Sequence, residues 1–201
     1  MLLALTFTGL YYYKGFSKTI TKNHVHSNNL EKNELDEIRK KAAEIRQFGK
    51  EKCFNRQYLF LVDMKIPSGK NRFFVYDLLK DSILKMGLVA HGAGREMFSL
   101  SPIFSNTKES GCTALGKYKI GAPYKGRFGK AYKLYGLDSS NSNSFARNIV
   151  LHAYTCVPDK ETYPYPICNS LGCPMVSYLF LSKLQPIIDN SPKPILMWIY
   201  Q

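Results

Sequence analysis

The sequence lacks the signatures of several large protein classes. None of its five cysteines is spaced C-x-x-C, which argues against a zinc ribbon. It contains no internal repeat, no basic helix and no RNA-binding motif, so its positive charge alone does not indicate a nucleic-acid-binding protein. Its longest apolar run, residues 1–13, is shorter than the roughly 20 residues typical of a transmembrane helix.

Acidic residues are also scarce. The chain has 15 Asp and Glu against 28 Lys and Arg, a formal net charge of +13. The cations are spread along the sequence rather than gathered in one segment. An anionic matrix, a membrane surface or a solvated basic surface each accounts for such a charge, and composition does not choose among them.

The 201 residues suit a single domain, and 14 Tyr and 12 Phe favour β-strands. Residues 1–13 resemble the hydrophobic part of an export signal or membrane anchor, although no basic residue precedes them and no A-x-A site follows. The alternative is a buried N-terminal strand. We expect a signal or anchor at 1–13, a linker and amphipathic helix at 14–50, and the folded domain at 51–201.

Hydrophobic periodicity predicts one early helix followed by strands. Leu35, Ile38, Ala42 and Ile45 recur at spacings of three and four, which predicts a helix over 30–48. Asn28 or Asn29 is its expected cap and Gly49 its expected stop. We expect a hairpin over 57–79, strands within 87–94, 114–121, 130–137, 148–154 and 194–200, and a short helix within 174–190. This order predicts a mainly β sandwich or barrel.

The window 149–177 carries the candidate chemistry. His152 ends an apolar strand, and Cys173 lies in the turn S-L-G-C-P. An adjacent imidazole can turn a thiol into a thiolate, so we expect Cys173 to ionise below the ordinary thiol pKa of ~8.5. Gly172 permits a sharp turn, and the N–H groups of Gly172 and Cys173 are candidates for an oxyanion hole. Ser170 can hydrogen-bond within the turn or to substrate.

Two other pairings of these residue types remain open. His91 and Cys112 are separated by the same number of positions as His152 and Cys173, so spacing does not choose between the pairs. Cys156 and Cys168 bracket a proline-rich loop and can form a disulfide, but the sequence does not give the connectivity.

Several stretches match a known family in order: DMKIPSGKNRFFVYDL, GLVAHGAG, TALGKYKIG, NIVLHAY and SLGCP. With them, residues 53–200 resemble the L,D-transpeptidase catalytic domains of the YkuD type, in the variant branch with an S-x-G-C-P motif. The resemblance implies that Cys173 is the nucleophile, that His152 is its base, and that the carbonyl of Ala153 orients the imidazole. Ser170 and Gly172 match the small residues of the nucleophile turn.

The resemblance also places other residues. His91, Tyr118 and Leu171 become candidates for substrate contact, while Cys112 falls at a non-catalytic position. Leu171 and Met175 stand where the widespread motif S-H-G-C-x-R has His and Arg. The lost arginine removes a carboxylate clamp. Its charge has four candidate replacements: Lys117, Lys119, Lys125 and Arg127.

The implied activity is acyl transfer on peptidoglycan tetrapeptide stems through a Cys173 thioester. An amine acceptor gives a 3-3 cross-link, and water gives L,D-carboxypeptidase trimming. No metal or organic cofactor is implied, no nucleic acid is expected as a partner, and the protein is expected to be exported to the periplasm or cell envelope. The alternative from another class is a catalytically inactive wall-binding protein, motivated by Leu171 and Met175.

Overall fold

The computed structural model describes residues 30 and 32–201. The signal or anchor predicted at 1–13, the linker up to residue 29 and the cap at Asn28 or Asn29 lie outside the described residues. The chain divides into two compact units, Met1–Leu35 and Asp36–Gln201, and the second contains every described strand. The predicted boundaries at 13 and 50 stay predictions. Among the described residues, no helix has both the length and the apolar character to cross a membrane.

The predicted amphipathic helix is present as α2, Lys32–Glu51. Ile38, Ala42 and Ile45 are buried along one face, as the periodicity requires. The helix does not stop at Gly49, which is buried inside its last turn. The left-handed backbone that ends such a helix occurs instead at Cys53, with φ 59°. The expected stop was therefore wrong.

Eight strands form one mixed sheet in the order β3-β2-β1-β8-β4-β5-β6-β7. Their bounds are β1 Tyr58–Asp63, β2 Phe73–Asp77, β3 Ser82–Gly87, β4 Gly116–Gly126, β5 Gly129–Gly136, β6 Val150–Ala153, β7 Met175–Val176 and β8 Leu196–Tyr200. The 3-10 helix η1 spans Ser139–Asn141. Strands β1 and β2 are antiparallel neighbours, which confirms the hairpin predicted over 57–79. Strands β1 and β8 are parallel, as are β6 and β7.

The sequence missed β3 and β7, and the strand expected at 87–94 is not a regular one. In that segment Ala90 forms an isolated bridge with Met175, and Gly92 forms one with Ser170. The segment is thus fixed to the turn that carries Cys173 instead of extending a ladder. Strand β7 has only two residues, too few to show the alternation by which strands are recognised.

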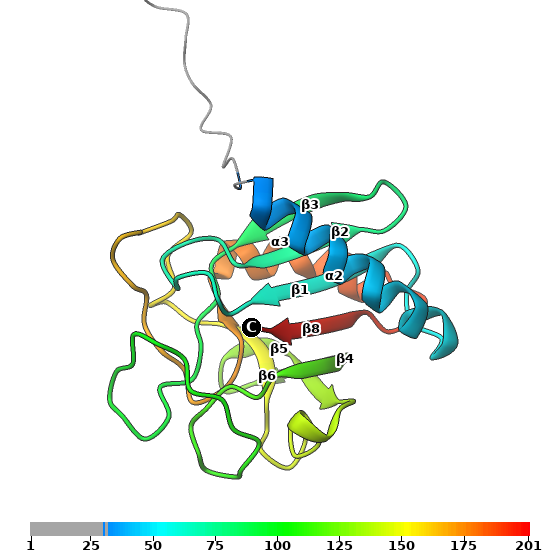
Figure 1. The fold of residues 1–201 in the computed structure, drawn as a ribbon. Coiled ribbons are helices and arrows are strands. Elements are labelled where there is room, and N and C mark those ends of the chain that lie inside the picture. Colours follow the sequence, from blue (N-terminus) through cyan, green and yellow to red (C-terminus); the bar gives the residue numbers. More distant parts are fainter. Residues whose placement is uncertain (1–29, 31) are drawn as a thin grey trace, which may run out of the picture. The chain divides into compact units, whose positions relative to one another are not determined.

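Helix α3, Tyr178–Asp189, confirms the short helix expected within 174–190. Ser177 caps it by accepting a hydrogen bond from the Phe180 N–H. Its apolar side packs into the main core through Phe180, Leu181, Leu184 and Ile188. Figure 1 shows α2 and α3 on opposite faces of the central strands. The mainly β class with these two helices is confirmed.

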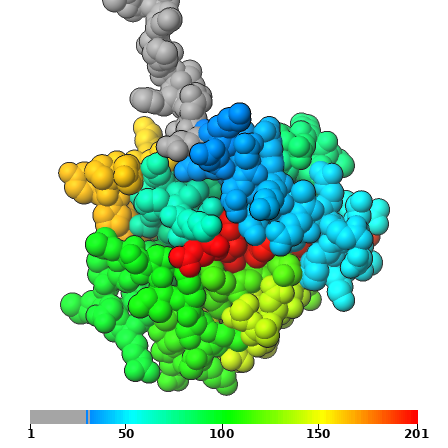
Figure 2. Space-filling model, in the orientation of Figure 1, coloured from blue at the N-terminus to red at the C-terminus, as the bar shows by residue number. Residues whose placement is uncertain are grey.

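The outer face of β8 lies beside α2. The Lys41 ammonium sits 4.5 Å from the ring centroid of Trp198, a cation–π contact between helix and strand. Figure 2 shows β8, in red, at the surface between the blue residues of α2 and the green segment. The end of the sheet formed by β6 and β7 carries the candidate chemistry.

Candidate active site

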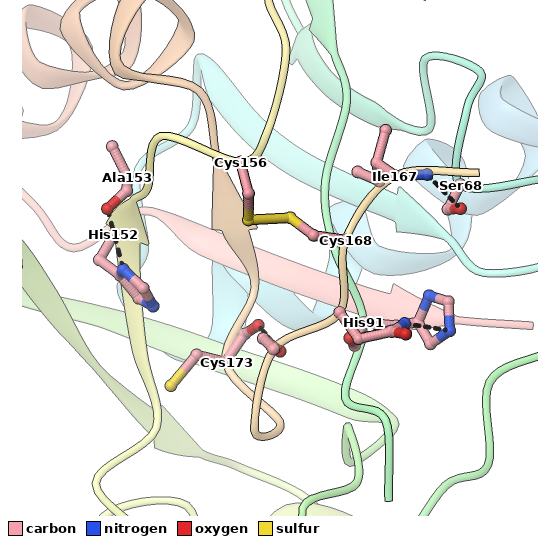
Figure 3. Close-up of a disulfide and its surroundings, with 10 residues drawn as sticks. Ser68, His91, His152, Ala153, Cys156, Ile167, Cys168 and Cys173 are labelled. Atoms are coloured by element: carbon pink, nitrogen blue, oxygen red, sulfur yellow. Dashed lines mark hydrogen bonds between the residues drawn. A yellow bond between two sulfur atoms is a disulfide. The ribbon is translucent and has the colours of Figure 1, made fainter. Parts of the chain in front are cut away.

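His152 and the approach to Cys173 lie on neighbouring parallel strands. His152 pairs with Met175, and Cys173 precedes Met175 by two residues. The Cys173 sulfur lies 3.5 Å from the Val150 N–H and 3.8 Å from the Asn148 carbonyl oxygen. It therefore sits against β6 at a position two residues from His152. Figure 3 shows the imidazole and the sulfur extending on the same side of the disulfide.

The His152 imidazole is buried and hydrogen-bonded to the backbone. It is 3% exposed, and its Nδ1 lies 3.1 Å from the Ala153 carbonyl oxygen. A carbonyl oxygen only accepts, so Nδ1 carries the hydrogen and Nε2 presents a lone pair. Burial lowers the pKa of His152, an effect that the Ala153 hydrogen bond partly opposes. The ring is therefore neutral at pH 7.

Phe128 supports this ring and was not found from the sequence. It stacks on His152 with ring centroids 4.2 Å apart and an interplanar angle of 21°. Tyr154 packs edge-on against Phe128 at 6.0 Å. Phe128 lies in the short turn between β4 and β5. An aromatic residue between the strands predicted at 114–121 and 130–137 was the available signal.

The pKa of the Cys173 thiol is shifted in the direction opposite to the expected one. Burial raises its pKa, while the Val150 N–H and the charge of Arg147 act in the opposite direction. The expected lowering of the thiol pKa is therefore wrong for the resting protein. Since His152 is also neutral, the two groups form a thiol and an imidazole rather than a preformed ion pair.

The turn itself is held by Ser170. Its hydroxyl donates to the Cys173 carbonyl oxygen at 2.7 Å and accepts from the Gly172 N–H at 3.1 Å. One of the two N–H groups considered for an oxyanion hole is thus engaged. The Cys173 N–H has no acceptor among the described residues, so it is the donor that remains for an oxyanion.

Gly172 should not tolerate a side chain. Its φ is +108°, and a Cβ there would lie 2.5 Å from the Cys112 carbonyl oxygen. We expect Gly172→Ala to lower the free energy of unfolding by about 3 kcal/mol or more, because strain and overlap add. Urea unfolding measures this.

Gly129→Ala is the matched control. Gly129 also has positive φ, +77°, but no atom lies within 4 Å of the point where its Cβ would be. Its replacement should cost only the backbone strain, about 1 kcal/mol. Equal losses in the two variants would contradict a tightly packed nucleophile turn.

Arg147 lies beside the same turn and was also missed. It donates through Nη1 to the Ser105 carbonyl oxygen at 2.7 Å, and through Nη2 to the Cys112 carbonyl oxygen at 2.5 Å. Its Nη2 also lies 3.3 Å from the Ser110 hydroxyl. A cavity of about 440 Å³ adjoins it, lined by Lys108, Glu109, Gly111, Ala146, Arg147, Asn148 and Leu171. A cation just before the histidine strand was the signal available in the sequence.

The three residues expected to contact substrate separate in the structure. Leu171 is 81% exposed and lines the cavity beside Arg147. Tyr118 is fully buried, and its hydroxyl donates to the Ala114 carbonyl oxygen at 2.6 Å. Burial raises the pKa of Tyr118 to about 12. His91 is fully buried as well. Only Leu171 is thus exposed to a ligand arriving from solvent.

His91 is part of the support beneath the site. Its Nδ1 lies 2.9 Å from Arg72 Nη2, and its Nε2 lies 3.2 Å from the Ser99 carbonyl oxygen. Burial, together with the Arg72 charge, lowers the pKa of His91 to about 4. Its carbonyl oxygen accepts from the Ser170 N–H at 2.8 Å. The structure therefore engages His91 with Arg72 and the nucleophile turn, and Cys112 hydrogen-bonds to Ser110 instead.

Three of the four cations considered as replacements for the missing motif arginine have partners away from the Cys173 turn. Lys117 pairs with Asp138 at 2.9 Å, and Lys119 lies over the Tyr135 ring. Arg127 lies over Phe128, which itself stacks on His152. None of these three has a contact with the Cys173 turn, whereas Arg147 does.

The Cys156–Cys168 disulfide is formed. Cys156 follows His152 by four residues, and Cys168 precedes Cys173 by five. In Figure 3 the bond joins the segment after β6 to the segment that leads into the nucleophile turn. Free cysteines are Cys53, Cys112 and Cys173. In the described part of the chain, no group of three or more His, Cys, Asp or Glu side chains is arranged to hold a metal ion.

Residues 29–200 match the family model of the L,D-transpeptidase catalytic domain. No curated protein matches the chain significantly. Among solved structures, an L,D-transpeptidase from Xylanimonas cellulosilytica is 12% identical with a TM-score of 0.42, over 77% of this chain and 68% of that one. The helical cell shape determining protein Pgp2 from Campylobacter jejuni is 13% identical with a TM-score of 0.43, over 72% of this chain and 48% of that one. The chain thus spans about half of the Campylobacter protein.

Proposed function

This chain belongs to the L,D-transpeptidase catalytic domain family, which acts on peptidoglycan, and from that premise we propose that it is a cysteine acyltransferase for tetrapeptide stems. In this proposal Cys173 is the nucleophile and His152 its general base, and the product is a 3-3 cross-link. The observation that carries the proposal is the position of the His152 ring, whose Nδ1 hydrogen-bonds the Ala153 carbonyl oxygen. It lies two residues along β6 from Val150, whose N–H contacts the Cys173 sulfur.

Acylation begins with proton transfer from the Cys173 thiol to His152 Nε2. The sulfur then attacks the carbonyl carbon of the L-centre of meso-diaminopimelate, and the Cys173 N–H donates to the developing oxyanion. The C–N bond to the terminal D-Ala breaks, and the imidazolium returns its proton to the leaving amine. Because the resting thiol and imidazole are neutral, each proton movement balances without an added acid or base.

Deacylation uses the same imidazole. The side-chain amine of a second stem attacks the thioester, His152 accepts the amine proton, and that proton returns to the sulfur. Water in place of the amine gives a trimmed stem and hence L,D-carboxypeptidase activity. Neither route calls for a metal or an organic cofactor.

The proposal includes export to the periplasm or cell envelope, with residues 1–13 as signal or membrane anchor. Two observations support this location. Disulfides persist in oxidising compartments, and the chain holds one between Cys156 and Cys168. The net charge of +13 suits a polymer that carries carboxylates.

The test is incubation of the purified protein with tetrapeptide muropeptides, followed by mass spectrometry of the products. We expect a cross-linked dimer, a covalent adduct on Cys173, and a loss of turnover on the order of 10⁴-fold or more in Cys173→Ala. Cys112→Ala is the matched control, because that thiol is free but buried and should not be needed.

The products decide among the alternatives. Trimmed monomers without dimers would assign L,D-carboxypeptidase activity to the same site. Absence of any turnover by folded protein, together with retained binding to muropeptides, would replace the enzyme by a wall-binding module. Equal loss in the Cys173 and Cys112 variants would remove Cys173 from its role as nucleophile.

A further inference from the structure

We propose that Arg147 binds the carboxylate of the donor stem's terminal residue, in the cavity beside the nucleophile turn. This inference rests on the proposed function and adds to it a residue that selects the substrate. The cavity shares walls with the site, since Asn148 and Leu171 both line it. Asn148 also supplies the carbonyl oxygen that the Cys173 thiol contacts, and Leu171 belongs to the nucleophile turn.

The guanidinium is held in place with donors to spare. Arginine has five N–H donors in a planar fork. Arg147 uses three of them, on Ser105, Ser110 and Cys112. Nε–H and the second Nη1–H have no acceptor among the described residues. A guanidinium already fixed on protein oxygens loses little freedom when it receives a carboxylate. The two remaining donors lie on different edges of the group, so a carboxylate oxygen accepts one charge-assisted hydrogen bond there rather than a bidentate pair.

Arg147 lies within reach of the donor's terminal carboxylate while Cys173 attacks the scissile carbonyl. During attack the scissile carbonyl carbon must lie about 3 to 3.5 Å from the sulfur. The terminal carboxyl carbon is two bonds beyond the scissile nitrogen, so it falls within a few ångströms of the turn. Arg147 Nη2 is 3.1 Å from the point where a Cβ on Gly172 would lie. The charge also acts on the site itself, since Arg147 opposes the burial effect on the pKa of Cys173.

The charge of the cavity agrees with an anionic ligand. Arg147 and Lys108 contribute two positive charges to the lining, and Glu109 contributes one negative charge. Met175 occupies the position where the widespread motif has an arginine, and it is packed in a buried cluster with Leu88 and Ala90. The positive charge near the nucleophile therefore comes from the segment before β6 rather than from the residue after the turn.

The experiment separates binding from turnover. The peptide L-Ala-γ-D-Glu-meso-diaminopimelate-D-Ala and its C-terminal carboxamide are titrated by calorimetry into Cys173→Ala protein, with and without Arg147→Gln. Loss of the carboxylate should weaken binding about 10- to 100-fold when Arg147 is present. With Arg147→Gln, the acid and the amide should bind within about twofold of each other. Lys80→Gln, an exposed charge in the β2–β3 turn at the opposite edge of the sheet, should leave the acid-to-amide ratio unchanged.

Arg147→Lys covers the case in which the glutamine variant does not fold. It keeps the charge and loses the planar guanidinium that Ser105, Ser110 and Cys112 hold in place. The ratio of its affinity for the acid to its affinity for the amide should therefore fall below that of the arginine protein while exceeding one. Equal affinities for the acid and the amide with Arg147 present would overturn the assignment. So would an undiminished preference for the acid in the Arg147→Gln protein. Failure of the proposed function shows differently, as an absence of turnover by the unmutated protein while these binding ratios still report on Arg147.

Discussion

His152→Ala should slow acylation of Cys173 by about 10²- to 10⁴-fold, the usual contribution of a general base. The physical reason is that the resting thiol keeps its proton. Burial raises the pKa of Cys173 and lowers that of His152, so little thiolate forms until the imidazole takes the proton during attack. Single-turnover acylation with a tetrapeptide donor, followed by mass spectrometry, measures the step directly.

The dependence of activity on pH shows which protonation state of His152 is the active one. The base must be neutral, so activity should fall as the pH drops through the pKa of His152, with a midpoint below the ordinary value of 6.5. In His152→Ala this acid limb should vanish. The residual rate should instead rise on the alkaline side, where the thiol ionises. An acid limb with its midpoint above 6.5 would contradict a neutral resting imidazole.

Alkylation of Cys173 by iodoacetamide is the accompanying control. In the resting protein the reaction should follow ionisation above the ordinary thiol pKa, and His152→Ala should change that midpoint little. Reaction well below the ordinary thiol pKa, lost in the variant, would instead identify a thiolate–imidazolium pair. That outcome would restore the expectation drawn from the sequence, in which an imidazole alone was taken to lower the thiol pKa.

The sequence predicted those parts of the fold in which local pattern determines structure. The stripe Ile38, Ala42 and Ile45 is local, and so is the alternation across the β1–β2 hairpin. The end of α2 was misplaced because glycine only permits a left-handed turn, and packing allows Gly49 to stay helical while Cys53 makes the turn. Strand β7 could not be seen because its two residues form a strand only through their pairing with β6.

The residues of the candidate site fall into the same two groups, those that local sequence indicates and those that tertiary packing brings in. A motif and a strand end are sequence features, so the sequence alone indicates His152 and Cys173 as candidates. Phe128 and Arg147 reach the site from other segments through tertiary packing, which no local pattern reports. The thiol pKa was misjudged for a related reason, since burial is a property of the assembled core and opposes the effect of a neighbouring base.

Removal of the disulfide in Cys156→Ser/Cys168→Ser should lower the free energy of unfolding by about 3 kcal/mol, the loop-closure value for a bond that spans 12 positions. Turnover should fall as well, by up to about 10²-fold, because small displacements of reacting groups are costly. Urea unfolding and muropeptide turnover, each with and without dithiothreitol, measure the two effects. The reductant should reproduce the double variant in the unmutated protein and have no further effect on the variant itself.

The expected loss of activity follows from where the bond lies. Between Ala153 at the end of β6 and Met175 at the start of β7, the chain forms no helix or regular strand. Hydrogen bonds to other segments hold this connection in place, among them the one from the Ile167 N–H to the Ser68 hydroxyl at 3.3 Å, drawn in Figure 3. The disulfide joins the two ends of this connection, close to His152 on one side and to Cys173 on the other, and so limits how far these two residues can separate. Unchanged turnover in a destabilised double variant would mean that the pairing of β6 with β7 alone sets their distance.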